Sequence, residues 1–229
     1  MRIGVLLSGS GVYDGAEIHE SVFTLLAIDE HKGRAICMAP NIRQHHVLNH
    51  LDGSEMNETR NVLLEAARIA RGSITDLALV KADDLDALVI PGGFGAAKNL
   101  TTWAFDGPDG AINADVKRII SEMVKARKPV VGLCMGPTVI AKALEGTGLN
   151  EHLTVGTTNE ASPYEIAAIS QGMEKAGAVA EMKSIREISI DRQNRIITAP
   201  CYMMEASISD VRNNIKQAID ELFEMFEHA

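Results

Sequence analysis

The chain has 229 residues, of which 31 are acidic and 22 basic, so its formal net charge at pH 7 is −9. This balance argues against nucleic acid and anionic membranes as partners, because phosphate groups are bound by a basic surface. Three cysteines without paired spacing argue against a disulfide framework and against a metal site. The first apolar run reaches glycines after five positions, too few for a signal-peptide core, so we expect a cytoplasmic protein.

Apolar runs and amphipathic stretches alternate along the chain. The apolar runs predict buried strands over 3–7, 34–39, 87–90, 129–133 and 154–157. Helical spacing predicts helices over 16–32, 57–71, 113–126, 138–144, 163–176 and 208–226, with Asn57 or Thr59 capping the second. Residues 185–190 and 195–199 are expected to pair as an antiparallel hairpin at a sheet edge, and 40–56 as a short hairpin outside the sheet.

This alternation indicates a single domain over residues 1–229, with an α/β fold of the doubly wound, three-layer class. A mainly parallel sheet is then covered by helices on both faces, and an aromatic content of 4% fits its aliphatic core. Ligands of such folds bind at the carboxyl ends of the strands. The turns that follow the strands are therefore the places where we expect the chemistry.

The turn after the strand over 129–133 carries the strongest chemical pattern. It reads Gly132-Leu133-Cys134-Met135-Gly136 and joins an apolar strand to a helical stretch, which is the arrangement of a nucleophile elbow with cysteine in place of serine. The glycines allow a tight turn, and the N-terminus of the following helix favours the Cys134 thiolate. The alternative is a buried cysteine at a strand end, because free cysteine is among the most buried residue types.

Two further turns bring polar groups to the same edge. Gly92 and Gly93 follow the strand over 87–90, and their N–H groups, with that of Met135, are candidates for an oxyanion hole. An ordinary glycine turn is the alternative. Glu17 begins the helix after the first strand, although an acid at a helix N-terminus is also common because of the helix dipole alone. Cys201 follows the last strand and faces this edge too.

Four stretches give the chain a resemblance to a known family. They are Ser8-Gly-Ser-Gly-Val-Tyr-Asp-Gly-Ala-Glu-Ile-His-Glu20, Glu58-Thr-Arg-Asn-Val-Leu63, Pro91-Gly-Gly-Phe-Gly-Ala-Ala-Lys-Asn-Leu100 and the Cys134 elbow. With these stretches the chain resembles the ElbB-type proteins, also called isoprenoid-biosynthesis or sigma cross-reacting proteins. These belong to the ThiJ/PfpI branch of the class I glutamine-amidotransferase-like superfamily. The similarity covers nearly the whole chain.

The resemblance implies a flavodoxin-like α/β sandwich, usually a homodimer, that converts glyoxal to glycolate without metal, glutathione or another cofactor. Some interpret this glyoxalase activity as deglycase activity. The Gly-x-Glu motif of the superfamily implies a carboxyl beside the nucleophilic thiol, here Glu17, and the family also supports Gly92, Gly93 and Met135 as donors. A Cys-His hydrolase is disfavoured, because Met135 stands where the protease pattern has histidine.

A thiol assisted by a carboxyl suits addition to an aldehyde. Cys134 would form a hemithioacetal with a small carbonyl substrate such as glyoxal, and a partly desolvated Glu17 would move a proton between its two carbons. Hydrolysis of the resulting thioester would give glycolate. A substrate of this size needs only a narrow site.

Two alternatives from other functional classes stay open. In the first, the protein is a redox or stress sensor in which Cys134 is oxidised. In the second, it is a non-catalytic binding module in isoprenoid metabolism or transcription, and Arg60, Asn61 and Lys98 bind an anionic ligand. Surface salt bridges are the simpler explanation for these last three residues.

Overall fold

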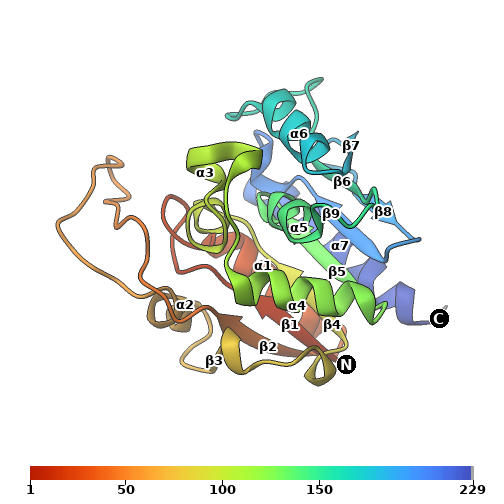
Figure 1. The fold of residues 1–229 in the computed structure, drawn as a ribbon, viewed down its shortest axis with the longest axis horizontal. Helices are drawn as coiled ribbons and strands as arrows, with labels where there is room; N and C mark the ends of the chain where they lie inside the picture. The colour runs from red at the N-terminus through yellow and green to blue at the C-terminus, as the bar shows by residue number, and fades with distance from the viewer. Residues whose placement is uncertain (228–229) are drawn as a thin grey trace.

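The computed structural model describes residues 1–227, and residues 228 and 229 of the predicted domain lie outside this part. Its centre is a seven-stranded sheet (Figure 1). Neighbouring strands are parallel except at one edge, where β8 runs antiparallel to β9. Across the sheet the strands are β3 (Ile74–Asp76), β2 (Arg34–Ala39), β1 (Arg2–Leu6), β4 (Ala87–Ile90), β5 (Val130–Leu133), β9 (Ile196–Ala199) and β8 (Ser189–Asp191).

Helices cover both faces of this sheet. On one face α1 (Ile18–Glu30) packs against α7 (Ile208–Glu227) and α2 (Val62–Ile69), and on the other α4 (Ala114–Lys125) packs against α5 (Gly136–Leu144) (Figure 1). Apart from the short edge strand β3, the order β2-β1-β4-β5-β9 is the flavodoxin-like order. The predicted three-layer, flavodoxin-like fold is therefore confirmed.

The central strands are apolar because helices cover both of their faces. β4 reads Ala-Leu-Val-Ile and β5 reads Val-Val-Gly-Leu, and every one of these residues is buried. Ile90 of β4 is level with Gly132 of β5, and Leu133 is level with Ala199 of β9. The turns that leave these three strands therefore meet at one edge of the sheet, where the polar groups of the elbow region were expected.

A second, two-stranded sheet lies outside the main one. It pairs β6 (His152–Gly156) in parallel with β7 (Val179–Met182), and α6 (Ile166–Lys175) packs on both (Figure 1). The sequence analysis predicts β6 and α6 but not β7 or β3, because both missed strands are short and largely free of apolar runs. The predicted edge hairpin is confirmed as β8 and β9, although β8 is shorter than expected.

The segment between β2 and α2 differs from its prediction. It projects from the sheet as a loop with two isolated antiparallel bridges, between Leu48 and Glu55 and between Arg43 and Asn61, in place of the paired strands of a hairpin (Figure 1). The helix that follows begins at Val62, five residues later than expected from the start at 57. Its cap is Asn61, whose Oδ1 accepts a hydrogen bond of 3.1 Å from the Leu64 N–H.

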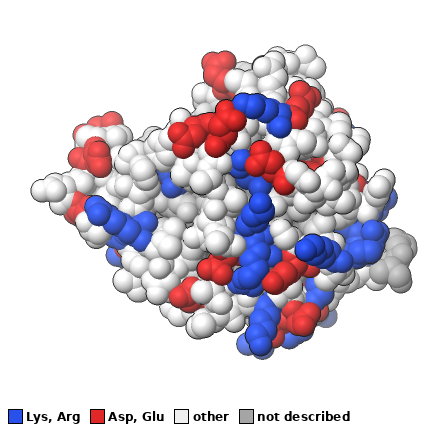
Figure 2. All heavy atoms as spheres, viewed as in Figure 1, with Lys and Arg blue, Asp and Glu red and all other residues white. Residues whose placement is uncertain are grey.

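Charged side chains of both signs lie side by side on the face drawn in Figure 2, where a band of basic residues is flanked by acidic ones. Arg118 of α4 is an example, since its guanidinium lies 3.2 Å from the carboxylates of both Asp115 and Glu122. Such pairs, three and four residues apart, are neighbours on a helix surface. Across residues 1–227, every helix is too short or too polar to cross a membrane.

The position of the α2 cap gives a test of the fold. We expect Asn61→Ala to lower the free energy of unfolding by about 1 kcal/mol, because the first turn of α2 loses its side-chain acceptor. Asn57→Ala, at an exposed position before the helix, is the matched control and should leave stability unchanged. Urea unfolding followed by circular dichroism measures both, and an equal loss in the two variants would contradict the assignment of the cap.

Candidate active site

The Cys134 turn has the geometry of a nucleophile elbow. Cys134 has a φ of +55°, a backbone angle that residues other than glycine rarely adopt. It lies in the short turn that joins β5 to α5. A Cβ on Gly132 would lie 2.8 Å from Ile140 Cδ1, and a Cβ on Gly136 would lie 2.5 Å from the Ile90 carbonyl oxygen. The two glycines are therefore required by close packing, and the elbow predicted from the sequence is present.

The carboxyl that contacts the Cys134 thiol belongs to Glu20. This side chain is fully buried and forms a hydrogen bond with the thiol. Its Oε2 accepts a 3.0 Å hydrogen bond from the N–H of Gly92, and its Oε1 accepts one of 3.3 Å from the N–H of Tyr202. The carboxyl is thus held in a fixed orientation beside the sulfur by the turns after β4 and β9.

Glu17, the residue that the sequence analysis places beside the thiol, has a different position. It is the cap of α1, and its Oε2 accepts a hydrogen bond of 2.6 Å from the N–H of Glu20. Its side chain is 8% exposed and lines the cavity in front of Cys134. The hydrogen bond to the thiol therefore comes from the residue one helical turn further along α1, because the Glu17 side chain turns back to cap the helix.

The three N–H groups expected to form an oxyanion hole do not all donate to the same group. Those of Gly93 and Met135 form hydrogen bonds with the Cys134 sulfur. The N–H of Gly92 instead donates to Glu20, so it is not free to receive a developing oxyanion. The geometry leaves Gly93 and Met135 as the donors on the reactive side of the turn and makes Gly92 a support of the acid.

Burial controls the protonation of the acid and the thiol. Burial raises the pKa of Glu20 to about 8, and the nearby charge of Glu17 adds to this rise. Burial also raises the pKa of the Cys134 thiol well above its usual range, with the Glu20 charge contributing. The N–H groups of Gly93 and Met135 lower this pKa, but by less. The stabilisation of the thiolate that was expected from the helix N-terminus is therefore smaller than the destabilisation of the thiolate by burial.

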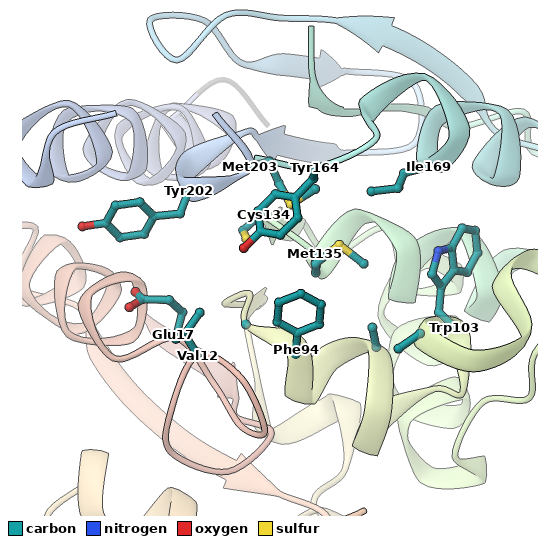
Figure 3. Close-up of a pocket in the computed structure, with 13 residues that line it drawn as sticks. Val12, Glu17, Phe94, Trp103, Cys134, Met135, Tyr164, Ile169, Tyr202 and Met203 are labelled. Atoms are coloured by element: carbon teal, nitrogen blue, oxygen red, sulfur yellow. The ribbon is translucent and has the colours of Figure 1, made fainter. Parts of the chain in front are cut away.

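A cavity of about 250 Å³ opens beside the sulfur (Figure 3). Its walls are mostly apolar and aromatic, and Glu17 is the one ionisable carboxylate among the lining residues of the described chain. Figure 3 shows Glu17 and Tyr202 at one end, Cys134 in the middle, and Trp103 and Ile169 at the other end. The expectation of a narrow site is wrong, because an engineered cavity of roughly 150 Å³ already holds benzene.

Two polar side chains border this cavity in addition to Glu17. Burial raises the pKa of Tyr164 to about 12, so its hydroxyl stays a hydrogen-bond donor at neutral pH. The hydroxyl of Tyr202 is 2.9 Å from Nδ1 of His19 on α1. Cys201 is fully buried against the backbone N–H of Cys134, which agrees with its expected place near the site. In residues 1–227, no group of three or more His, Cys, Asp or Glu side chains is placed to hold a metal ion.

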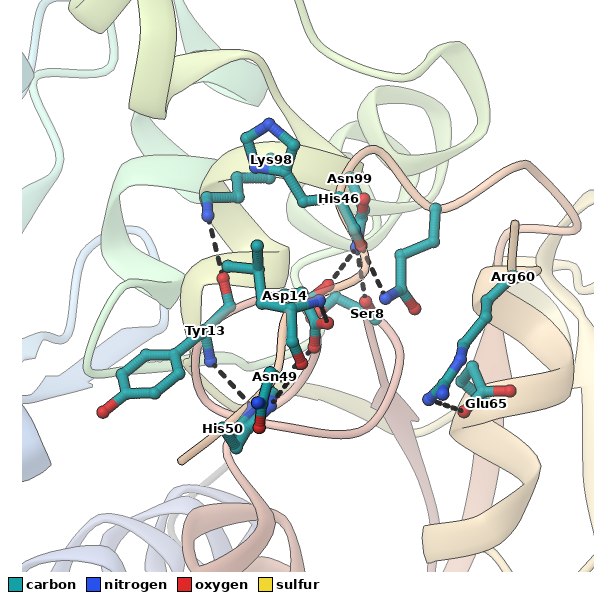
Figure 4. A network of polar contacts seen from close by, with 12 residues as sticks. Ser8, Tyr13, Asp14, His46, Asn49, His50, Arg60, Glu65, Lys98 and Asn99 are labelled. Carbon is teal, nitrogen blue, oxygen red and sulfur yellow. Dashed lines mark hydrogen bonds and ion pairs between the residues drawn. The ribbon is translucent and has the colours of Figure 1, made fainter. Parts of the chain in front are cut away.

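The three residues considered for an anionic ligand, Arg60, Asn61 and Lys98, do not share one site (Figure 4). Lys98 donates to the Tyr13 carbonyl oxygen at 2.9 Å and lines a different hollow from Arg60 and Asn61. The Arg60 guanidinium lies 2.7 Å from the Glu58 carboxylate, and Asn61 caps α2. The expected surface salt bridge is present for Arg60, whereas Lys98 and Asn61 are held by a backbone carbonyl and by the capping of α2.

Comparisons with known proteins identify the family. The chain is 38% identical to the human glutamine amidotransferase-like class 1 domain-containing protein 3, mitochondrial, over 226 residues, covering 98% of this chain and 83% of that protein. It is 37% identical to the mitochondrial ES1 protein homolog of Rattus norvegicus, covering 98% and 84%. The chain belongs to the ES1 family of glutamine amidotransferase-like class 1 proteins. No protein-family model matches the chain.

Solved structures agree with the placement in the ES1 family. An isoprenoid biosynthesis protein with an amidotransferase-like domain from Ehrlichia chaffeensis is 31% identical and has a TM-score of 0.89, with 99% of each chain covered. A ThiJ/PfpI domain protein from Brachyspira murdochii is 13% identical, with a TM-score of 0.55 and coverage of 97% of this chain and 96% of that one. This second likeness shows the shared fold alone.

The names of the ES1 relatives also correct one prediction. The human and rat proteins are both named as mitochondrial, which contradicts the cytoplasmic location expected from the sequence. That expectation rested on unpaired cysteines and a short first apolar run. Unpaired cysteines argue only against an oxidising compartment and do not separate one reducing compartment from another.

Sequence reasoning missed Glu20 and most of the cavity wall. Glu20 stands three residues after Glu17 in the same helix, so helical spacing alone was a signal that either carboxyl could face the elbow. Trp103 and Tyr164 come from segments outside the main sheet, and their contribution depends on tertiary packing. No local pattern in the sequence marks them.

The raised pKa of Glu20 predicts a pH-dependent stability. The folded protein holds this proton up to about pH 8, whereas the unfolded chain releases it near 4.5, so the stabilisation is complete below pH 4.5 and is lost as pH rises to 8. The loss in free energy of unfolding amounts to at most about 5 kcal/mol, at about 1.4 kcal/mol per pKa unit. We expect Glu20→Gln to flatten this slope.

Urea unfolding at pH 5 and pH 8.5 measures the slope. Glu224→Gln, on an exposed position of α7, is the control and should behave as the wild type. A Glu20→Gln protein whose stability still falls between the two pH values as steeply as the wild type would show that the buried proton is held elsewhere.

Proposed function

We propose that this protein is a glyoxalase that converts glyoxal to glycolate with Cys134 as nucleophile and without glutathione or metal. The observation that carries the proposal is a buried carboxyl hydrogen-bonded to an elbow thiol that faces an apolar cavity. A thiol and one protonatable acid are the groups that addition to an aldehyde and an internal proton shift require. The resemblance to ElbB-type proteins supports the same reaction.

The first step forms a carbon–sulfur bond. In the reactive form, Cys134 and Glu20 share a single proton, and Glu20 takes it from the thiol. The sulfur attacks one aldehyde carbon of glyoxal, and the carbonyl oxygen receives the proton back from Glu20, which gives a hemithioacetal. The N–H groups of Gly93 and Met135 lie beside the sulfur and stabilise the oxygen while it is negative.

The second step moves a proton between the two carbons. The Glu20 carboxylate removes the hydrogen from the hemithioacetal carbon and returns a proton to the neighbouring carbon through an enediol. The product is a glycolyl thioester on Cys134, which water hydrolyses to glycolate and the free thiol. The buried Glu20 suits both transfers, because a pKa of about 8 lets it accept and donate near neutral pH.

The cavity favours this proposal over the redox sensor. A carbonyl substrate needs a chamber next to the sulfur, and the cavity with its apolar walls supplies it. Oxidation by a peroxide needs no such chamber. The homodimer expected from the resemblance stays a prediction.

Three variants test the roles of the site residues. We expect Cys134→Ser to lower glycolate formation from glyoxal by at least roughly 10³-fold, because the nucleophile is lost. Glu20→Gln should cost about 10²- to 10⁴-fold, because an amide cannot carry the proton. Glu17→Gln should lose far less, because the amide oxygen of glutamine can still cap α1.

Glycolate is measured by chromatography, with the folding of each variant checked by circular dichroism. Full activity in Cys134→Ser would overturn the proposal. A larger loss in Glu17→Gln than in Glu20→Gln would return the acid–base role to Glu17.

The protonation of the pair predicts a pH profile as well. Because the form with one shared proton increases as pH approaches the Glu20 pKa of about 8, kcat/KM for glyoxal should rise up to 10-fold per pH unit below this value. Stopped assays between pH 6 and pH 9 measure the profile. A profile that is flat from pH 6 to pH 8 would exclude Glu20 as the group that takes the thiol proton.

A further inference from the structure

The cavity beside Cys134 is much larger than glyoxal requires. Glyoxal has four heavy atoms, whereas a cavity of roughly 150 Å³ already holds the six carbons of benzene. The cavity here measures about 250 Å³. When glyoxal is bound at the sulfur, most of the apolar wall would therefore remain without a partner, and a pocket of this kind gains affinity from a ligand that fills it.

The two ends of the cavity differ in chemistry (Figure 3). Glu17 and the hydroxyl of Tyr202 stand at one end, and the sulfur of Cys134 lies in the middle. Trp103 and Ile169 form the opposite end. A substrate whose reacting carbonyl is at the sulfur can therefore extend an apolar group toward Trp103 while its polar oxygens stay near the other end.

Packed aromatic side chains form much of the apolar wall of the cavity. Trp103 is 7% exposed and packs on α6 at Gly172, where an added Cβ would lie 2.8 Å from the indole ring. The rings of Phe94 and Tyr164 meet edge to face with their centroids 5.8 Å apart. These contacts come from three separate segments and fix the shape of the wall before any ligand binds.

The charges around the cavity exclude anionic tails. Glu17 is the one carboxylate among the lining residues of the described chain, and the buried Glu20 contacts the Cys134 sulfur. Lys98 sits over the Phe94 ring at 5.2 Å, and its Nζ donates to the Tyr13 carbonyl oxygen at 2.9 Å. The lining residues of the described chain include no lysine or arginine, so a carboxylate or phosphate in the cavity would lie near Glu17 without either of these cations on the wall. The polar stem of a glycated lysine or arginine would face apolar walls.

We propose that the preferred substrates are uncharged α-oxoaldehydes that carry an apolar group of about six carbons on the ketone carbon, and that the Trp103 end of the cavity binds this group. The inference rests on the proposed glyoxalase function and names its substrate class. With phenylglyoxal as the probe, the sulfur adds to the aldehyde carbon and the hydrogen of that carbon moves to the ketone carbon. Water then releases mandelate from the thioester, so one phenylglyoxal and one water give one mandelate and one proton.

The first experiment compares two substrates. We expect kcat/KM for phenylglyoxal, measured as mandelate formed, to exceed that for glyoxal by about 10- to 100-fold, as burial of one aromatic side chain would give. Ala104→Leu, at an exposed position that lines the cavity and follows Trp103 in the chain, should lower this ratio at least several-fold. Ala168→Leu, at an exposed position of α6 outside the cavity wall, is the matched control and should keep the wild-type ratio.

The second experiment measures binding without turnover. Trp103 is the single tryptophan of the sequence, so intrinsic fluorescence excited at about 295 nm reports this wall directly. Cyclohexanol, which carries an apolar ring but no aldehyde, should change the emission saturably in the wild type and in Cys134→Ser. The change should weaken in Ala104→Leu. Neither the wild-type titration nor the wild-type substrate ratio depends on the folding of a variant.

The outcomes separate this inference from the function on which it rests. Turnover of glyoxal with no preference for phenylglyoxal, or an emission that cyclohexanol leaves unchanged, would overturn the apolar-tail assignment and leave the glyoxalase intact. Cyclohexanol binding without turnover of either aldehyde would overturn the glyoxalase and, with it, the α-oxoaldehyde class. Saturable binding together with a preference for phenylglyoxal that Ala104→Leu reduces supports the proposal.

Discussion

The site depends on one hydrogen bond between two buried groups that both resist ionisation, the Glu20 carboxyl and the Cys134 thiol. Buried polar groups must find partners, and these two find them in backbone N–H groups. Gly92 and Tyr202 donate to the acid, while Met135 is one of the donors to the sulfur. The contact therefore requires the turns after β4, β5 and β9 to meet the helix after β1, which is what the parallel sheet provides.

The same contact explains why the turn after β4 needs glycine at position 92. A Cβ on Gly92 would lie 2.7 Å from both the Cys134 sulfur and Glu20 Oε2, so a side chain there would push the acid and thiol apart. Gly93 has a different reason, a φ of +93° together with a backbone contact to Glu17 N. Gly92 is thus required because a side chain would not fit, and Gly93 is required because of its backbone conformation.

Local patterns predicted the parts of the molecule that local physics determines. Continuous apolar runs identified β1, β4 and β5, and the glycine spacing around Cys134 identified the elbow. The choice between Glu17 and Glu20 was beyond these patterns, because it depends on which side chain turns back to cap α1. The preference for a thiolate also failed, since the helix N-terminus is visible in a sequence but desolvation is a property of the packed core.

Chemistry and selectivity come from different parts of the fold. The acid, the thiol and their donors belong to turns and helix starts at the edge of the main sheet, so they are fixed by the strands that hold the domain together. Trp103 lies in the short helix α3 (Trp103–Asp106), and Ile169 lies in α6. Neither helix contributes to the main sheet. Substitutions in these two segments can therefore change the shape of the cavity while the reacting groups keep their positions, and substrate preference can vary on a constant catalytic frame.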